Sequence, residues 1–385
     1  VLVGDGTQDP RNYEGNEQSP DLIPPFLAYR VGDPAENTYV DPFIRQTGCE
    51  NCFAQLDGAD PLTGDEPIGT ALRPGASFFP DIMLGRLPVK NAAELRDLIA
   101  KMLRYETEYD AWDPLNEKLV FLADNFVKSC DPDGPRDTAG DFATYSDEII
   151  ATLPDTLAIE RIYYDPPQIY DPNDRDRDGS ICDYATPVSS NGPREGNPAT
   201  VYAKVQSTLR QAASLVTYNG HASQWRWAVT ERITNSSSSV PQDAPEHLFY
   251  IWDVLSLNNA DHLFVALSMS CLTSQFHKPV DWGMTLDEHL LLRANGGAVA
   301  TWGSTGLSVA QGHFALERGF HETLWAKQGG RSRMGDLVMG GYLEQYTKSA
   351  CCDDVRRTFM LMGDPMTRVR IGEIDGAYLP LVARE

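Results

Sequence analysis

Residues 215–224 read LVTYNGHASQ, and the way this apolar run ends decides the fold class that the sequence predicts. Residues 215–218 form an apolar, β-branched run, which is typical of a buried strand. The turn residues Asn219 and Gly220 end the run, and His221 follows them directly. Sheets built of parallel strands carry their functional side chains just past the carboxyl ends of the strands. If this run is a strand of such a sheet, His221 lies at the edge where a functional site is expected.

Short apolar runs and helical repeats alternate along the rest of the chain. Apolar runs followed by turn residues predict strands at 1–3, 82–84, 119–122, 159–164, 263–267, 298–301 and 359–362. Apolar residues that recur three and four positions apart predict helices at 91–109, 201–213, 313–327 and 335–348. This alternation predicts an α/β fold, in which helices cover both faces of a mostly parallel sheet.

The composition is that of a globular protein with a strong acidic excess. The 385 residues exceed what one core usually holds, so we expect two domains or two lobes. The net charge of -23, from 55 acidic and 32 basic residues, argues against nucleic acid or anionic membranes as partners, because both would repel the chain. A cationic substrate or bound calcium fits this charge better. The sequence contains no apolar span of 18 residues, so we expect no transmembrane segment.

A second residue at a strand end suggests peptide hydrolysis. The predicted strand 263–267 leads to Ser270 and Cys271, and Cys271 follows His221 by about 50 residues. This order and spacing resemble caspase-type cysteine proteases, in which a thiolate attacks the peptide carbonyl and an imidazole protonates the leaving amine. The backbone N–H groups of Cys271 and Ala222 would hold the developing oxyanion. A buried cysteine alone is more often a small core residue, and a lone strand-end histidine is usually structural, but the pair favours catalysis.

Several blocks of sequence resemble the gingipain-like cysteine peptidases of caspase-type fold. In order, they read VLVGDGTQDP, PDIMLGRLPVKNAAEL, KMLRYE, KLVFLADN, YNGHAS, LSMSCLTS, GGAVATWGSTG and LMGDPMTRVRI. The resemblance implies a caspase-like three-layer fold, with a mostly parallel sheet flanked by helices and part of a similar lobe before it. It implies a partial non-catalytic lobe at 1–109, a catalytic lobe at 110–372 and a C-terminal extension at 373–385. The family usually has Gly-His-Gly, whereas here Ala222 follows His221.

The resemblance also implies a third catalytic residue and a wall of the substrate cleft. In the family, a carboxylate that orients the histidine follows the first strand of the catalytic lobe, and here that place reads LADN. We assign the role to Asp124 and keep Asn125 as the alternative register; a cap of the following segment is the structural alternative for Asp124. The stretch GGAVATWGSTG is expected to line the cleft through the substrate-binding residues Trp302, Ser304 and Thr305.

An acidic residue suggests the cleavage specificity. In the arginine-specific members of the family, an acidic side chain soon after the third catalytic position lines the pocket for the residue before the scissile bond. The segment YSDEI offers Asp147 at about that place. A carboxylate would pair with a guanidinium or an ammonium group, so we predict cleavage after Arg or Lys, with Asp147 at the pocket floor. The alternative is that Asp147 caps the helix that begins SDEIIATL.

The segment 171–183, DPNDRDRDGSICD, carries the strongest metal motif in the chain. Its D-x-D-x-D-G spacing is that of the start of a calcium loop, in which alternate oxygens converge on the ion and the glycine permits the turn. Position twelve is Ala185 where an EF-hand has Glu, and Asp183 is the candidate to replace that ligand. The predicted ligands of a structural Ca2+ are Asp174, Asp176, Asp178, Ser180 and Asp183. A solvated acidic loop is the alternative, and no organic cofactor is expected.

The cysteines leave one thiol over. Their number is seven, so pairing in a secreted chain would leave one unpaired. Cys49 and Cys52 form a C-x-x-C in which a local disulfide is the simplest interpretation, because a zinc site would need two further ligands. These observations predict a secreted or cell-surface cysteine endopeptidase that acts on peptides or proteins. The rivals are a catalytically silent relative that serves as a binding or secretion-associated module, and a calcium-stabilised adhesion domain.

Overall fold

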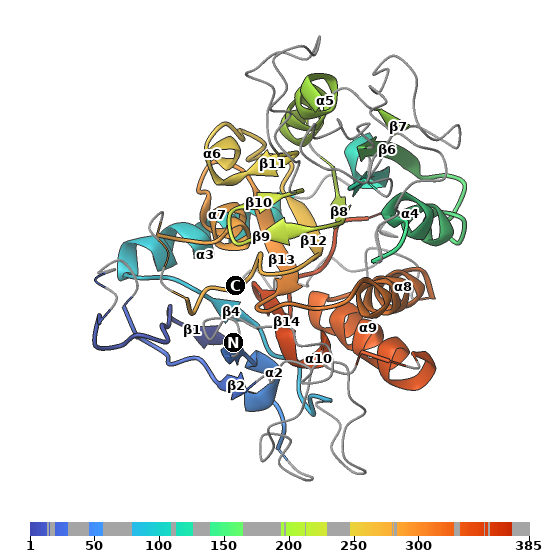
Figure 1. Ribbon diagram of the computed structural model, residues 1–385. Coiled ribbons are helices and arrows are strands. Elements are labelled where there is room, and N and C mark those ends of the chain that lie inside the picture. The colour runs from blue at the N-terminus through green and yellow to red at the C-terminus, as the bar shows by residue number, and fades with distance from the viewer. Residues whose placement is uncertain are drawn as a thin grey trace, which may run out of the picture.

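The computed structural model describes the chain in segments, and nine strands within them form one sheet (Figure 1). The described residues are 1–13, 15, 20–29, 46–56, 79–108, 113–125, 139–164, 194–195, 198–211, 213–228, 247–278, 280, 283–326, 332–349, 351–352 and 355–371. The strands lie in the order β1 (Leu2–Val3), β4 (Arg86–Leu87), β14 (Phe359–Met362), β13 (Ala298–Ser304), β12 (Phe264–Met269), β8 (Leu215–Asn219), β5 (Lys118–Ala123), β6 (Ala158–Tyr164) and β7 (Arg194–Glu195).

The sheet is mostly parallel, which confirms the predicted fold class. Of its neighbouring strand pairs, β13 and β14 run antiparallel and the others run parallel. The strand predicted at 82–84 is wrong: Ile82 and Met83 are 45% and 38% exposed, and β4 begins only at Arg86. The side chain of Arg86 is buried, and its Nε donates to Glu50 Oε2 at 2.8 Å, so an ion pair rather than an apolar run marks this strand.

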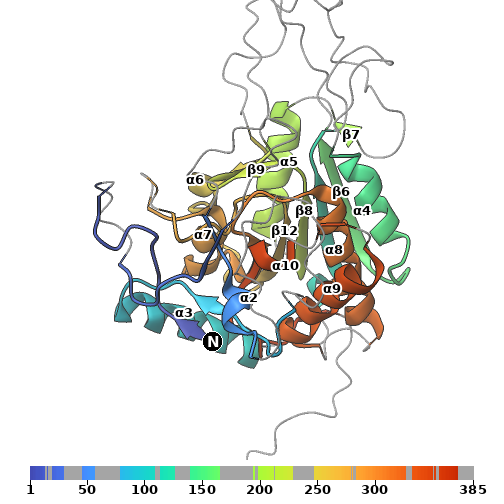
Figure 2. The same ribbon diagram turned by 60° about the horizontal axis from the view of Figure 1, so that its bottom comes forward.

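Helices cover both faces of the sheet (Figures 1 and 2). One face carries α4 (Phe142–Ile150), α8 (Ala310–Ala326) and α9 (Met334–Lys348). The other carries α5 (Pro198–Gln211), α6 (Ile251–Val254) and α7 (Leu286–Leu292), with α3 (Ala92–Thr107) beside α7. All four predicted helices are present, as α3, α5, α8 and α9, with ends shifted by a few residues.

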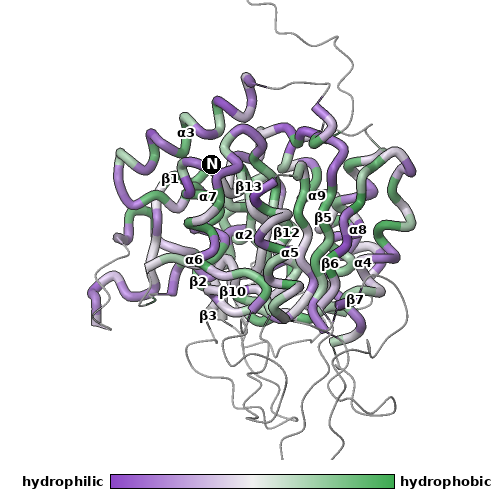
Figure 3. Tube along the Cα trace, turned by 90° about the horizontal axis from the view of Figure 1, so that it is seen from above, coloured by the Kyte–Doolittle hydropathy of each residue, from purple (hydrophilic) through white to green (hydrophobic). Residues whose placement is uncertain are grey.

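Alternate residues of the central strands enter two separate cores. In β5, Leu119 and Phe121 pack with α4, α8 and α9, whereas Val120 and Leu122 pack with α5, α6 and α7. Hydrophobic residues accordingly colour the central strands in Figure 3. Burial of a side chain of this size stabilises the fold by about 1.5–3 kcal/mol. Because both faces are covered, a central strand such as β8 is buried at every position instead of alternating between buried and exposed residues.

Strands from both sides of the predicted boundary at 109/110 belong to this sheet. β1 pairs with β4, and β4 pairs with β14, so the early strands extend the sheet beyond its antiparallel pair. The hairpin β2 (Leu27–Tyr29) and β3 (Gln46–Gly48) leads into α2 (Glu50–Phe53). The boundary itself remains a prediction, and the extension predicted at 373–385 lies outside the described residues.

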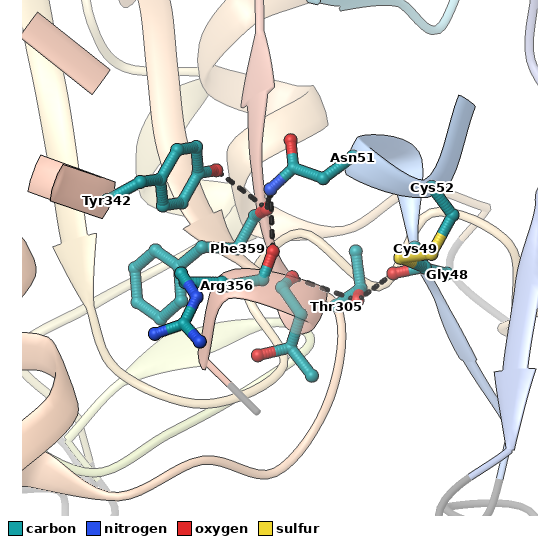
Figure 4. The surroundings of a disulfide bond; sticks show 9 residues. Gly48, Cys49, Asn51, Cys52, Thr305, Tyr342, Arg356 and Phe359 are labelled. Carbon is teal, nitrogen blue, oxygen red and sulfur yellow. Dashed lines mark hydrogen bonds between the residues drawn. A yellow bond between two sulfur atoms is a disulfide. The ribbon is translucent and has the colours of Figure 1, made fainter. Parts of the chain in front are cut away.

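The short helix α2 is closed by a local disulfide and docked against the end of the sheet by polar contacts (Figure 4). Cys49 and Cys52 form the predicted local disulfide. Asn51 Nδ2 donates to the carbonyl oxygens of Arg356 (2.6 Å) and Phe359 (3.4 Å), where α10 (Val355–Thr358) leads into β14. These contacts hold the early part of the chain beside the end of β13.

Candidate active site

Three adjacent strands end beside one another in the middle of the sheet. β8 lies between β5 and β12, with Asn219 opposite Ala123 on one side and Met269 on the other. Asp124 N–H donates to the Asn219 carbonyl at 2.9 Å. Because all three strands are parallel, the residues that follow them, Asp124, His221 and Cys271, lie at the same edge. The sequence predicted this neighbourhood of the His and Cys motifs, and the strand register confirms it.

The loop that carries His221 is fixed by its backbone, while the imidazole lies at the surface. His221 N–H donates to Asp124 Oδ2 at 3.2 Å. The His221 carbonyl accepts from Tyr218 Oη at 2.5 Å and from Ala228 N at 2.9 Å. The imidazole meets the ring of Phe142, the first residue of α4, edge-on at 5.4 Å between centroids. Residue 221 is exposed, so its ring is accessible to a substrate.

Tyr218 stays a hydrogen-bond donor beneath this loop. Burial raises the pKa of its phenol well above the ordinary value, and the nearby Asp124 raises it further. The protonated hydroxyl can therefore donate to the His221 carbonyl. The phenol ring stacks on Trp227 at 5.1 Å, and Trp227 belongs to a small sheet of β9 (Ala222–Ser223), β10 (Arg226–Trp227) and β11 (Phe249–Tyr250).

Gly220 is required by space at this turn. A Cβ atom on residue 220 would lie 2.4 Å from Tyr218 Oη and 2.5 Å from the Cβ atom of Asp124. Both distances are far shorter than a van der Waals contact, so any side chain would displace the His221 loop. The Asn-Gly that ends the apolar run is thus a packing requirement as well as a turn signal.

Asp124 is the residue of the LADN stretch whose carboxylate reaches the histidine loop. It is 1% exposed, and Oδ1 accepts Asn125 N–H at 2.8 Å while Oδ2 accepts His221 N–H. The carboxylate thus accepts hydrogen bonds from the backbone N–H groups of both Asn125 and His221. This geometry fixes the loop that carries the imidazole, and it favours Asp124 over Asn125 as the partner of that loop.

Cys271 is the one cysteine among the described residues that is not in a disulfide, since Cys351 and Cys352 also pair. Its side chain is partly exposed. The next residue, Leu272, has φ of 65°, a left-handed conformation that is unusual for a non-glycine residue and that clusters at functional sites. The sharp turn after β12 thus presents the thiol at the sheet edge.

The two predicted oxyanion donors also lie at this edge. One is the N–H of Cys271 itself, and the other belongs to Ala222, the first residue of β9. Ala222 pairs in register with Trp227 of β10. The small antiparallel sheet therefore holds the backbone that follows His221 in an extended conformation.

The side chains predicted to form the cleft wall are buried instead. Trp302 is fully buried in the core against Phe320 and Tyr342, and its Nε1 donates to Tyr342 Oη at 3.3 Å. Ser304 Oγ donates to the carbonyl of Gly306 at 2.8 Å. Strand β13 is buried on both faces, so none of these side chains faces a substrate.

Thr305 is likewise turned inward, as Figure 4 shows. Its Oγ1 contacts the carbonyls of Gly48 at 2.6 Å and Thr358 at 3.0 Å. The partly exposed residues 307–309, which follow directly, form the accessible part of this loop. The three predicted side chains therefore lie away from the accessible surface of this loop, and its role as a cleft wall stays a prediction.

Asp147 faces a neighbouring strand and not the His–Cys edge. Its Oδ1 accepts from Arg161 Nε at 3.0 Å and from Tyr163 Oη at 2.8 Å, and both partners belong to β6. A guanidinium of the chain itself therefore already pairs with this carboxylate. The cap interpretation is also wrong, because α4 begins at Phe142 and Asp141 is its N-cap, accepting the N–H groups of Ala143 and Thr144.

Ser308 and His313 were missed by the sequence interpretation. Ser308 N–H donates to Cys271 Sγ at 3.4 Å, and the Ser308 hydroxyl lies 2.5 Å from His313 Nε2. A serine and a histidine five positions apart in a loop and a helix carry no recognisable motif. Only the pairing of β12 with β13 brings their loop beside Cys271.

The predicted calcium ligands Asp174, Asp176, Asp178, Ser180 and Asp183 lie outside the described residues. In the part of the chain that the structure describes, no three His, Cys, Asp or Glu side chains are grouped so as to hold a metal ion. A search of the same residues found no helix both long enough and apolar enough to cross a membrane.

Comparison with known proteins agrees with the fold. The model of peptidase family C25 matches residues 1–370. The crystal structure of the Arg-specific cysteine proteinase gingipain R (RgpB) is similar, with a TM-score of 0.56 and 17% identity over 89% of this chain and 64% of that one.

Two further solved structures are similar at low sequence identity. The complex of Porphyromonas gingivalis RgpB pro- and mature domains gives a TM-score of 0.53 and 16% identity over 89% of this chain and 66% of that one. A structure described as a protease gives a TM-score of 0.54 and 14% identity over 91% of this chain and 65% of that one. The chain thus spans less than two thirds of the length of each of these structures. No curated protein matched the chain.

Proposed function

The chain belongs to peptidase family C25, and from that premise we propose that it hydrolyses peptide bonds with Cys271 as nucleophile and His221 as general acid/base. One observation carries the proposal: the exposed His221 and the partly exposed Cys271, which is in no disulfide, follow adjacent parallel strands at the same sheet edge. In a sheet of this kind, that edge is where reactive groups gather.

The proposed reaction has two stages. His221 accepts the thiol proton of Cys271, and the thiolate attacks the carbonyl carbon of the scissile bond. The N–H groups of Cys271 and Ala222 stabilise the oxyanion of the tetrahedral intermediate. Protonated His221 then gives its proton to the leaving amine, which leaves an acyl group on sulfur. Water, deprotonated by His221, attacks this thioester and releases the acid and the thiol.

Asp124 is proposed as a positioning residue for this reaction. Its carboxylate accepts the backbone N–H of His221, which supports a role in holding the loop at a fixed place above the sheet. A fixed imidazole lowers the entropy that must be lost before proton transfer. The buried position of the carboxylate protects this contact from competition by water.

We extend the proposal to cleavage after Arg or Lys. Two observations support it: the net charge of -23 attracts cationic substrates, and a structurally similar protein is described as Arg-specific. Asp147 is no longer the proposed counter-charge, because Arg161 already pairs with it. Hydrolysis of matched substrates with Arg, Lys, Asp, Asn or Leu before the scissile bond tests the preference, and a preference for Asp, Asn or Leu refutes it.

Export and calcium binding complete the proposal. Disulfides persist in oxidising compartments, so the Cys49–Cys52 and Cys351–Cys352 bonds support a secreted or cell-surface location. The D-x-D-x-D-G spacing at 174–179 supports a structural Ca2+. Millimolar-range calcium should then raise the melting temperature relative to chelator, and a triple change of Asp174, Asp176 and Asp178 to Asn should remove the difference.

Covalent labelling tests the central claim. A peptide carrying an electrophile after Arg should label Cys271 in the parent, and Cys271→Ala should abolish both labelling and hydrolysis. Measurement of the melting temperature controls for folding. A parent that neither hydrolyses peptides nor reacts with such a probe would instead be a silent binding module.

A further inference from the structure

Three polar groups of Ser308, in the neighbouring loop, lie close to the Cys271 sulfur. Ser308 N–H lies 3.4 Å from Sγ, the Ser308 carbonyl oxygen lies 3.5 Å from it, and the Ser308 hydroxyl lies 3.9 Å from it. The N–H group can donate to the thiolate, and the carbonyl can accept the proton of the thiol. Ser308 thus offers a partner to both protonation states of the nucleophile.

His313 fixes the conformation of Ser308. Its Nε2 lies 2.5 Å from Ser308 Oγ, and the ring is 4% exposed on the first turn of α8. The ring also packs against Phe359 at 5.1 Å between centroids, and the backbone N–H of His313 donates to the Val309 carbonyl at 3.2 Å. A buried imidazole with so many contacts is a rigid anchor for the hydroxyl.

The loop also lies at the N-terminus of a helix, whose electrostatic field favours a thiolate. Ser308 comes two residues before Ala310, where the 17-residue helix α8 begins. The N–H groups at a helix N-terminus favour negative charge nearby, and cysteine thiolates are stabilised there. A shift of the 306–309 loop would move the Ser308 N–H away from Sγ, so the anchor at His313 governs this contact.

We propose that Ser308 and His313 are positioning residues for the nucleophile: His313 holds the Ser308 hydroxyl, and the fixed Ser308 backbone holds the Cys271 thiolate. This role rests on the proposed function of Cys271. It assigns to α8 a part in the reaction that neither the His motif nor the Cys motif contains. Ser308 and His313 act through Cys271 and do not themselves transfer a proton to the substrate.

Alkylation of Cys271 by iodoacetamide as a function of pH tests the proposal without a peptide substrate. Mass spectrometry of the full chain identifies the labelled residue. In Ser308→Ala, the pH of half-maximal alkylation should rise by about 0.5–1 unit, because one hydrogen bond that fixes the thiolate partner is lost. In peptide hydrolysis, the kcat of Ser308→Ala should be about fivefold lower than that of the parent, with KM nearly unchanged.

Two replacements of His313 provide a matched pair. Gln reaches with its amide nitrogen to the place of Nε2, whereas Asn reaches only to the place of Nδ1. His313→Gln should therefore retain the parent's pH profile, and His313→Asn should shift it as Ser308→Ala does. His321→Gln, on the same helix and equally buried, is the control and should leave the profile unchanged.

The outcomes separate the two proposals. An unchanged alkylation profile in both Ser308→Ala and His313→Asn overturns the positioning role. If His313→Asn does not fold, Ser308→Ala alone decides, because it removes only a partly exposed hydroxyl. If the parent hydrolyses no peptide but the two variants still shift the pH profile of Cys271 alkylation, the positioning role is upheld and the proposed peptidase function is refuted.

Discussion

The strands β5 and β8 contact two contrasting sets of polar groups, one past the strand ends and one on helix α8. Past the ends, the exposed His221 is held through its backbone by Asp124. On α8, Glu317 and His321 are fully buried, and His321 stacks on Phe121 of β5 at 5.7 Å. Residue type is similar in the two places, but the surroundings differ.

Burial makes the second set electrically neutral. It raises the pKa of Glu317 to about 8, an effect only partly offset by Asn219, and it lowers the pKa of His321 to about 3. Neither group therefore carries much charge near pH 7. The comparison teaches that the imidazole past the strand ends is open to a substrate, whereas the one on α8 serves the packing of the core.

The largest expected effect separates the two histidines. His221→Ala should lower kcat/KM by about 10²–10⁴-fold through loss of the general acid/base, with the melting temperature nearly unchanged because the ring is exposed. His321→Ala should instead destabilise the fold by about 2–4 kcal/mol through the cavity it leaves, with activity per folded molecule retained. Kinetics and denaturant unfolding of both variants measure this, and equal losses of activity would end the contrast.

The second prediction tests how closely the histidine loop is packed. Gly220→Ala places a Cβ atom 2.4 Å from Tyr218 Oη, so the loop must move. A displacement of about 1 Å at a reacting group costs roughly 10²-fold in rate. We expect this loss in kcat/KM for the fraction of the variant that folds, as counted by active-site titration. Parent-like turnover would mean that the loop has room the structure does not indicate.

The third prediction distinguishes the two registers of the third catalytic residue. Asp124→Asn weakens the acceptor of the His221 N–H and should lower kcat/KM about tenfold, since a hydrogen bond to a charged group is lost. Asn125→Ala, the matched control, should change it less than twofold, because the substitution keeps the backbone N–H of Asn125 that donates to Asp124. The reverse order of effects would transfer the role to Asn125.

Much of the fold could be predicted from the sequence because the central strands are buried on both faces. The runs at 119–122, 215–218 and 359–362 are unbroken, and each became a strand with ends within about two residues. The strand predicted at 82–84 is wrong because the real strand begins at Arg86, a charged residue that is buried through its ion pair with Glu50. A local apolar pattern cannot reveal an ion pair between residues 36 positions apart.

Of the candidate site, the sequence could predict only the residues that directly follow a buried strand. His221 and Cys271 stand out because each ends a buried strand, but side-chain direction beyond a strand depends on tertiary contacts. Thr305 turns inward because carbonyls of Gly48 and Thr358 accept its hydroxyl. Ser308 reaches Cys271 because β13 pairs with β12. Neither contact leaves a mark in the local sequence.

The last prediction concerns the pH dependence of stability. The folded state holds the proton of Glu317 up to about pH 8, whereas in the unfolded chain it is lost near 4.5. Between these values the folded state binds more protons, so the free energy of unfolding falls as pH rises, by up to about 1.4 kcal/mol per unit from this group. Asp5, with a pKa raised by burial to about 7, acts in the same direction.

Glu317→Gln should therefore make the decline shallower. The amide resembles the protonated carboxyl group but does not ionise, and His321 remains neutral throughout this range, so its charge does not confound the comparison. Urea unfolding at intervals between pH 5 and 8 would measure the slope in the parent and in the variant, and Glu322→Gln, an exposed change on the same helix, serves as the control. At pH 5 the Gln variant should be about as stable as the parent, and its advantage should grow with pH, while its kcat stays unchanged. Parallel slopes in the two proteins would mean that Glu317 ionises in the folded state much as it does in the unfolded chain, and the contrast between the sheet edge and the buried face of α8 would lose its electrostatic basis.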